Sequence, residues 1–151
     1  MALDIPLQLL SEHLVFAVLE REALRMLAFA AERKDLSAGN ILFDQGEAAD
    51  AAYLILEGQV SITSVRAGQT KRRETAQAGA LLGESALITP TQHAATVRAE
   101  TATTLLRLPR SAYRRILEEF PRSAVDLRQK LAERLLATVG DLDTVRQSLE
   151  D

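Results

Sequence analysis

The chain has 151 residues, a length that suits one domain with a single hydrophobic core. Hydrophobic residues make up 47% of the sequence, yet no apolar run approaches the roughly 20 residues of a membrane-spanning helix, so we expect a soluble protein that makes no membrane contact. The formal net charge of -3 argues against a broad nucleic-acid-binding surface, and the absence of cysteine excludes disulfides, thiolate catalysis and Cys-ligated metal centres.

Residues 1–34 are predicted to form N-terminal helices. Apolar residues recur at helical spacing from Leu7 to about Ala31, which indicates two short helices that lean on a core elsewhere. Asp4 stands where a signal peptide would carry Lys or Arg, and no small-residue cleavage site follows an apolar run, so the segment predicts a cytoplasmic location. The two histidines, His13 and His93, are far apart, and we expect neither a metal nor another cofactor.

Residues 35–109 have the pattern of short strands separated by glycines. Glycines at positions 39, 46, 58, 68, 79 and 83 recur at about 5- to 12-residue spacing, as expected of tight corners that need a positive φ. With the later runs "AATVRAE" and "TTLLRLP", the segment contains about eight short strands, which predicts an antiparallel sandwich, roll or barrel. The cationic run Lys71–Arg73 is interpreted as a solvated hairpin tip.

Residues 110–151 are predicted to be helical. Pro109 ends the last strand, and Pro121 stands in a plausible first position of a long final helix. A heptad on this helix favours a homodimer through residues 124–149, although the same side chains could instead pack on their own domain. The d positions are Ala124, Leu131, Thr138 and Val145, and the a positions are Arg128, Leu135, Leu142 and Leu149.

The stretch "GESAL" carries the clearest functional signal. Gly83 precedes an acid at the expected start of a helical turn, where unpaired backbone N–H groups favour an anion such as phosphate. Glu84 would repel a phosphate, so its presence makes sense if it accepts a hydrogen bond from a neighbouring hydroxyl, as a ribose offers. Phosphate cradle and carboxylate together suggest a nucleotide.

The order of these motifs resembles the cyclic nucleotide-binding domain family. The resemblance rests on "ILFDQGEAADAAYLILEGQVSI" followed by "GALLGESAL" and "HAATVRA", and it covers roughly residues 14–149. The later "VRAETATTLLRLPRSAYRRIL" resembles the exit strands and following helix of catabolite-activator-type sensors. It implies a single domain over residues 1–151: a mainly β jelly-roll (double-stranded β-helix, or β-roll) with N-terminal helices and a long C-terminal helix, and a phosphate-binding cassette at residues 81–97.

The resemblance also implies the binding residues. Glu84 would accept a hydrogen bond from the ribose 2'-hydroxyl, and backbone amides of the cassette would surround the ribose-phosphate. Ala94 and Ala95 would let the backbone approach the phosphate, although strand packing explains them equally well. Thr138 would contact the purine from the dimer seam, or its hydroxyl would bond back to its own helix. The implied ligand-binding set is Leu82, Gly83, Glu84, Ser85, His93, Ala94, Ala95 and Thr138.

The sequence departs from the family pattern at His93, where the family has an Arg that contacts the cyclic phosphate. Histidine is mostly neutral at pH 7, and loss of a charge-assisted hydrogen bond commonly costs about 1.5 to 3 kcal/mol. A bound phosphate would raise the pKa of His93, which predicts tighter binding at pH 6 than at pH 8. Alternatively, His93 is a tolerated polar residue at the rim of a vacated pocket. Arg98 does not replace the missing arginine easily, because five residues along a strand it should point to the face opposite to that of His93.

These observations favour a regulatory sensor domain for a cyclic nucleotide, with cAMP and cGMP as the candidate ligands. No P-loop, nucleophile elbow or paired His-carboxylate set is present, so we expect no enzymatic activity. The sequence ends at Asp151 without room for a recognition helix, so we expect no direct nucleic-acid binding. The alternatives are a degenerate domain that serves protein interaction or dimerisation, and a fragment of a transcription regulator that lacks its helix-turn-helix.

Overall fold

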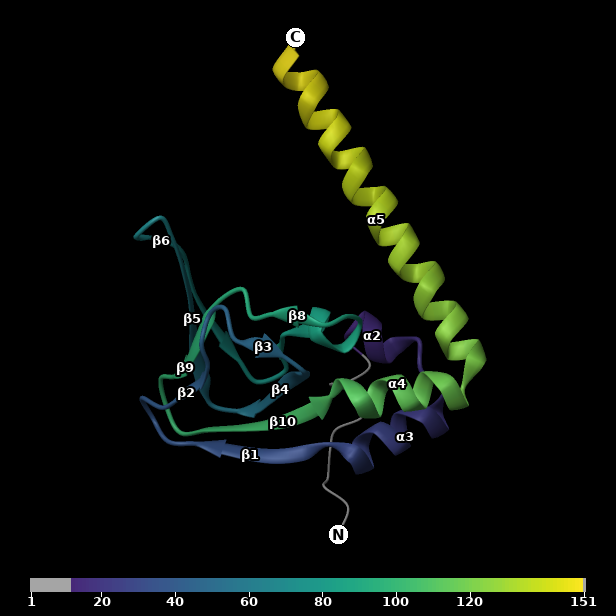
Figure 1. The fold of residues 1–151 in the computed structure, drawn as a ribbon, viewed down its shortest axis with the longest axis horizontal. Coiled ribbons are helices and arrows are strands. Elements are labelled where there is room, and N and C mark those ends of the chain that lie inside the picture. Colours follow the sequence, from purple (N-terminus) through teal and green to yellow (C-terminus); the bar gives the residue numbers. More distant parts are fainter. Residues whose placement is uncertain (1–11, 151) are drawn as a thin grey trace.

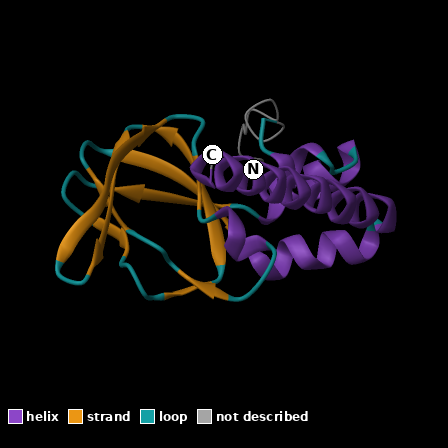
Figure 2. Cartoon of the chain, turned by 90° about the horizontal axis from the view of Figure 1, so that it is seen from above, coloured by secondary structure: helices purple, strands orange, loops and turns teal. Residues whose placement is uncertain are grey.

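The computed structural model describes the backbone of residues 12–150 and the side chains of residues 12–137. Strands gather at one end of the molecule and helices at the other (Figure 2). The last helix extends away from both (Figure 1). The predicted mainly β fold with flanking helices is confirmed.

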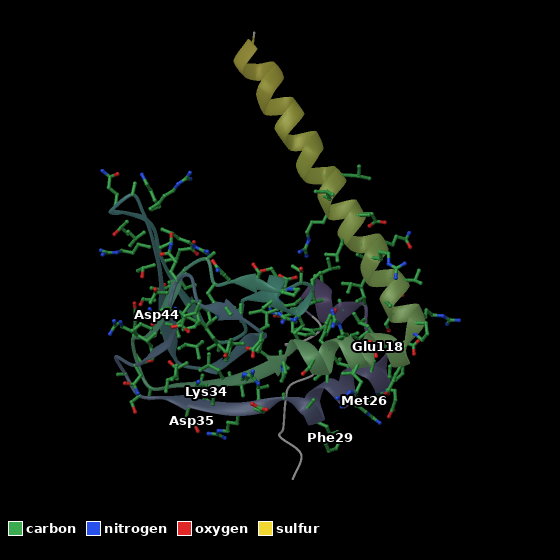
Figure 3. All side chains as sticks on the ribbon, viewed as in Figure 1. Met26, Phe29, Lys34, Asp35, Asp44 and Glu118 are labelled. Carbon is green, nitrogen blue, oxygen red and sulfur yellow. The ribbon has the colours of Figure 1, made fainter. Side chains whose placement is uncertain are left out.

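Two short helices precede the strands, as predicted: α2 (Leu14–Ala17) and α3 (Arg21–Ala30). The apolar stripe of α3 buries Leu24 and Leu27, whereas Phe29 is 80% exposed and points outward (Figure 3). The predicted helical start at Leu7 lies outside the described residues.

The prediction of helix up to residue 34 was wrong, because β1 (Glu32–Leu36) already begins there. Four of its five residues are exposed and polar, so the sequence shows neither the alternation nor the apolar run of a strand. β1 exists because it pairs antiparallel with a strand about 70 residues later, along a register from Glu32 opposite Arg107 to Leu36 opposite Thr103.

The described residues form two four-stranded antiparallel sheets, with strand orders β1-β10-β4-β7 and β2-β9-β5-β6, and a two-stranded ribbon of β3 and β8. The strands after β1 are β2 (Ile41–Phe43), β3 (Ala48–Ala49), β4 (Ala51–Glu57), β5 (Gln59–Arg66), β6 (Gln69–Gln77), β7 (Leu81–Leu82), β8 (Thr91–Gln92), β9 (Thr96–Ala99) and β10 (Thr103–Pro109). All six glycines expected at corners have a positive φ.

The core has two parts. One lies inside the roll, where buried side chains such as Ile62 and Val97 face each other from paired strands. The other lies between the helices and the outer face of the first sheet, and its largest fully buried side chain is Tyr113. The Tyr113 hydroxyl donates a 2.5 Å hydrogen bond to the carbonyl oxygen of Val15 and thereby ties the C-terminal helices to α2.

The C-terminal helices are α4 (Arg110–Glu119) and α5 (Pro121–Glu150), and Pro121 is the first residue of α5 as predicted. Leu127 of α5 is buried, and Leu131, which was expected in a dimer seam, packs against the core of its own domain. One turn further, Leu135 and Leu136 are 65% and 71% exposed. The side chains from Thr138 onward, including Val145, lie outside the described residues.

Candidate ligand-binding site

A cavity of about 540 Å³ opens on one side of the roll, between the cassette and the β5–β6 hairpin. Seven of the eight residues that the sequence singled out line it: Leu82, Gly83, Glu84, Ser85, His93, Ala94 and Ala95. The side chain of Thr138, the eighth, lies outside the described residues. The cassette residues therefore converge on one space, although they come from two segments about ten residues apart.

The first half of the cassette turns sharply at Gly83. This residue follows β7 and has the left-handed conformation (φ 72°, ψ 33°), after which the single 3-10 turn η1 (Glu84–Leu87) begins. The Ala86 N–H donates a 3.0 Å hydrogen bond to the Gly83 carbonyl oxygen and closes that turn. A Cβ on Gly83 would lie 3.8 Å from the His93 ring, so the turn places the two halves of the cassette in near contact.

Glu84 connects the cassette to the long helix. Its Oε1 lies 3.5 Å from Nη1 of Arg134 on α5, and the side chains of Glu84 and Arg134 are 32% and 54% exposed. At this distance and exposure, such an ion pair contributes less than about 1 kcal/mol. Sequence reasoning missed Arg134, because nothing in a pattern of neighbouring residues pairs positions 50 apart. The contact places the expected ribose partner within reach of α5.

His93 is buried and forms part of the cavity wall. The alternative interpretation, which placed it at the rim of the pocket, was wrong on this point. It is 9% exposed, and its ring stacks on that of Phe43 with centroids 3.5 Å apart and an interplanar angle of 5°. Its backbone exchanges two 2.8 Å hydrogen bonds with the turn before β3: His93 N–H donates to the Glu47 carbonyl oxygen, and Gly46 N–H donates to that of His93. The position is therefore rigidly held.

The electrostatics of His93 favour the neutral ring. Burial lowers the pKa of His93 below its ordinary value of 6.5, and the carboxylates of Glu47 and Asp50 oppose this effect only in part. His93 is therefore mainly neutral at pH 7 in the absence of a ligand.

The second half of the cassette presents small residues. Ala94 is exposed on the cavity side and Ala95 is buried, and neither side chain blocks the approach of a ligand to the backbone. Arg98 lies on the other face of β9, as predicted, and its Nη1 donates a 3.0 Å hydrogen bond to the Gly39 carbonyl oxygen. It therefore does not reach the cavity.

The hairpin contributes charged residues that sequence reasoning did not assign to the site. The run Lys71–Arg73 is not the tip of the hairpin, which lies at Ala67 and Gly68; it belongs to β6. Arg72 and Glu74 form an ion pair, and both line the cavity. The alternation of side chains along β6 explains the pairing, because residues two apart share a face.

The part of the chain that the structure describes contains no group of three or more His, Asp or Glu residues that could hold a metal ion. Within the same part, no helix is both long and apolar enough to cross a membrane. The site is thus a cavity whose cassette side carries the Glu84 carboxylate, the His93 ring and small side chains, which is an arrangement typical of small-molecule sites.

Comparison with known proteins identifies the class. The model of the cyclic nucleotide-binding domain family matches residues 33–120, more than half of the chain. This match includes all of the roll except Glu32, the cassette and α4. The chain belongs to the cyclic nucleotide-binding domain family.

Solved structures support the assignment. A cyclic nucleotide-binding-like protein from Brucella abortus is 38% identical, with a TM-score of 0.68 over 74% of this chain and 97% of that one. The N-terminal domain of a transcriptional regulator from Streptomyces coelicolor is 27% identical, with a TM-score of 0.79 over 89% of this chain and 94% of that one. The second match includes most of the flanking helices as well as the roll.

Among curated proteins, lysophospholipase NTE1 from Chaetomium globosum is 28% identical over 119 residues. The match covers 78% of this chain but only 8% of the fungal protein. The chain therefore spans less than a tenth of the length of this relative and corresponds to one small part of it.

Proposed function

We propose that this domain is a cytoplasmic, non-enzymatic sensor that binds cAMP or cGMP and passes the signal on through its C-terminal helix. The observation that carries the proposal is the convergence of the seven cassette residues on one cavity of about 540 Å³. This volume falls within the range of about 300–1,000 Å³ that is typical of small-molecule sites. Cassette amides would hold the phosphate, and Glu84 would accept from the ribose 2'-hydroxyl.

The contact between Glu84 and Arg134 supports a route for the signal. A ribose hydroxyl that bonds to Glu84 would compete with or reorient this ion pair, and α5 would then shift relative to the roll. Such a coupling is small in energy because the pair is largely exposed, so the ligand would shift the balance between positions of α5 that already coexist.

We further propose that the domain dimerises through α5. Leu135 and Leu136 leave an apolar patch on the helix just beyond the point where Leu131 packs on its own domain. A second copy would cover Leu135, which occupies an a position of the heptad over residues 124–149. The shift of α5 would then be read by a partner through the dimer.

The neutral His93 determines how tightly a cyclic phosphate would bind. Because burial lowers its pKa in the free domain, a phosphate would have to raise that pKa and bring in a proton on binding. Binding would then be tighter at pH 6 than at pH 8, with proton uptake between these values.

Isothermal titration calorimetry with cAMP and cGMP at pH 6 and pH 8 tests the sensor function. Saturable heat with either nucleotide, and tighter binding by the variant His93→Arg, would support it. Silence with both nucleotides for the wild-type domain and for His93→Arg would refute it. A flat pH profile in a domain that does bind would remove the role of the histidine proton and leave the sensor function standing.

One observation favours a second candidate function, a protein-interaction module that has lost its ligand. The stack of His93 on Phe43 fills the place of the family's arginine with an uncharged pair of rings. Under this alternative the domain would dimerise through α5 and bind no nucleotide at either pH. The same titrations, combined with sedimentation of the wild-type domain, separate the two functions.

A further inference from the structure

The cavity has a source of positive charge outside the cassette. Among the described residues that line it, Arg72 is the one lysine or arginine, and the same lining contains the carboxylates of Glu74 and Glu84 and the ring of His93. A cyclic phosphate carries a negative charge that has to be balanced when it leaves water. The cassette itself provides no guanidinium for this purpose.

The register of the second sheet places Arg72 level with the phosphate end of the cassette. Strand β5 lies between β9 and β6, and Thr63 of β5 is opposite Thr96 on one side and Arg73 on the other. The next step along β5 is Ser64, which is opposite Arg72, and the residue before Thr96 is Ala95. Two interstrand spacings, about 10 Å, therefore separate the backbones of Thr96 and Arg73, and Ala95 and Arg72 are the residues next to them.

Arg72 also projects from the correct face of β6. Directly opposed residues share a face of a sheet, and Glu74 is opposite Ile62, which is buried inside the roll next to Val97. Arg72, two residues from Glu74, lies on the same concave face. A long side chain from this position extends over the cavity toward the cassette.

The hydrogen bond to Glu74 orients the guanidinium of Arg72 and leaves its other N–H donors available. Arg72 donates through Nε to Oε1 of Glu74, and its two Nη groups carry four further N–H donors in a planar fork. Such a fork matches a phosphate, which can accept two parallel hydrogen bonds.

We propose that Arg72, supplied by the hairpin in place of a cassette arginine, is the cation that binds the phosphate of the cyclic nucleotide. The inference rests on the proposed sensor function and adds to it the residue that makes binding feasible with a histidine at position 93. It also gives the β5–β6 hairpin a role, because the strand that carries Arg72 would lie against the ligand on the side opposite the cassette.

The variant Arg72→Ala tests this inference against a matched control, Arg73→Ala. Arg73 is the neighbouring arginine on the same strand, but it projects from the opposite face and does not line the cavity. Titration of cAMP and cGMP should show affinity about ten- to a hundredfold weaker in Arg72→Ala, as expected for the loss of charge-assisted hydrogen bonds. Arg73→Ala should bind within about twofold of the wild type, because an exposed cation that does not touch the ligand contributes little.

The double variant Arg72→Ala/His93→Arg distinguishes a phosphate contact from a contact to the base. A guanidinium restored at position 93 replaces a lost phosphate partner, so the double variant should regain at least tenfold of the affinity that Arg72→Ala loses. If it regains none, Arg72 does not act on the phosphate and the inference is overturned.

The remaining outcomes separate the inference from the function on which it rests. Equal affinities of Arg72→Ala and Arg73→Ala, in a domain that binds nucleotide, overturn the inference and leave the sensor function intact. Absence of binding by the wild-type domain overturns the inference, and absence of binding by both the wild-type domain and His93→Arg overturns the sensor function as well. Circular dichroism of each variant confirms that a loss of affinity does not come from unfolding.

Discussion

Replacing Gly83 with alanine perturbs the cassette at the point where its backbone requires glycine. Gly83 has φ 72° and ψ 33°, and an L-residue with a Cβ pays about 1–2 kcal/mol in this left-handed region. The added Cβ would lie 3.4 Å from the Ala51 carbonyl oxygen and 3.8 Å from the His93 ring, which is close to ordinary contact. The expected loss of stability is therefore the backbone strain alone, about 1–2 kcal/mol.

Thermal unfolding measures this loss, and calorimetry measures its effect on the site. For a chain of this length, 1 kcal/mol corresponds to about 2–4 °C, so we expect the Tm of Gly83→Ala to fall by roughly 2–8 °C. The folded variant should bind cAMP or cGMP at least tenfold more weakly, because relief of the strain rotates the amides at the start of η1 away from the phosphate, with a loss of about 1.4 kcal/mol or more.

Gly39→Ala is the matched control for this experiment. Gly39 has φ +91° and no atom within 4 Å of an added Cβ, and it lies outside the cavity lining. It should lose comparable stability and keep the affinity of the wild type. If Gly83→Ala loses stability but binds nucleotide as well as Gly39→Ala does, the left-handed turn at Gly83 has no part in binding, and the assignment of the cassette is refuted.

Two further predictions concern buried polar groups. Tyr113→Phe removes the hydroxyl that donates to the Val15 carbonyl oxygen. Urea unfolding should show that the free energy of unfolding falls by about 1–3 kcal/mol. An unchanged midpoint would mean that water satisfies this carbonyl. Burial lowers the pKa of His93 below 6.5, so on acidification the unfolded chain takes up a proton at a higher pH than the folded domain does. The wild type should therefore lose stability relative to His93→Gln as the pH falls from 7 through 6.5 toward the lowered pKa. Parallel urea titrations at pH 7.5 and 5.5 check the sign, and an equal response of both proteins would contradict it.

The sequence by itself determined the features that depend on neighbouring residues. Glycines marked the corners because a residue without a Cβ adopts a positive φ at little cost, and all six have a positive φ in the structure. Pro121 marked the start of α5 because its ring fixes φ and its missing N–H has no partner in a first helical turn. The order of the cassette motifs identified seven residues that line one cavity.

Tertiary structure alone decided which distant residues meet. The polar strand β1 and the two-residue strands β3 and β8 have too little periodicity to be recognised, and they form because partners elsewhere in the chain supply their hydrogen bonds.

The same limit applies to the site. The stack of His93 on Phe43, the ion pair of Glu84 with Arg134, and the place of Arg72 over the cavity each join residues 20 to 50 positions apart. Side-chain alternation gives the face of a residue on its strand, but only the register between strands gives the residues opposite it. The sequence therefore identified the cassette that lines the cavity, and the folding of the sheet decided which charged residues lie around it.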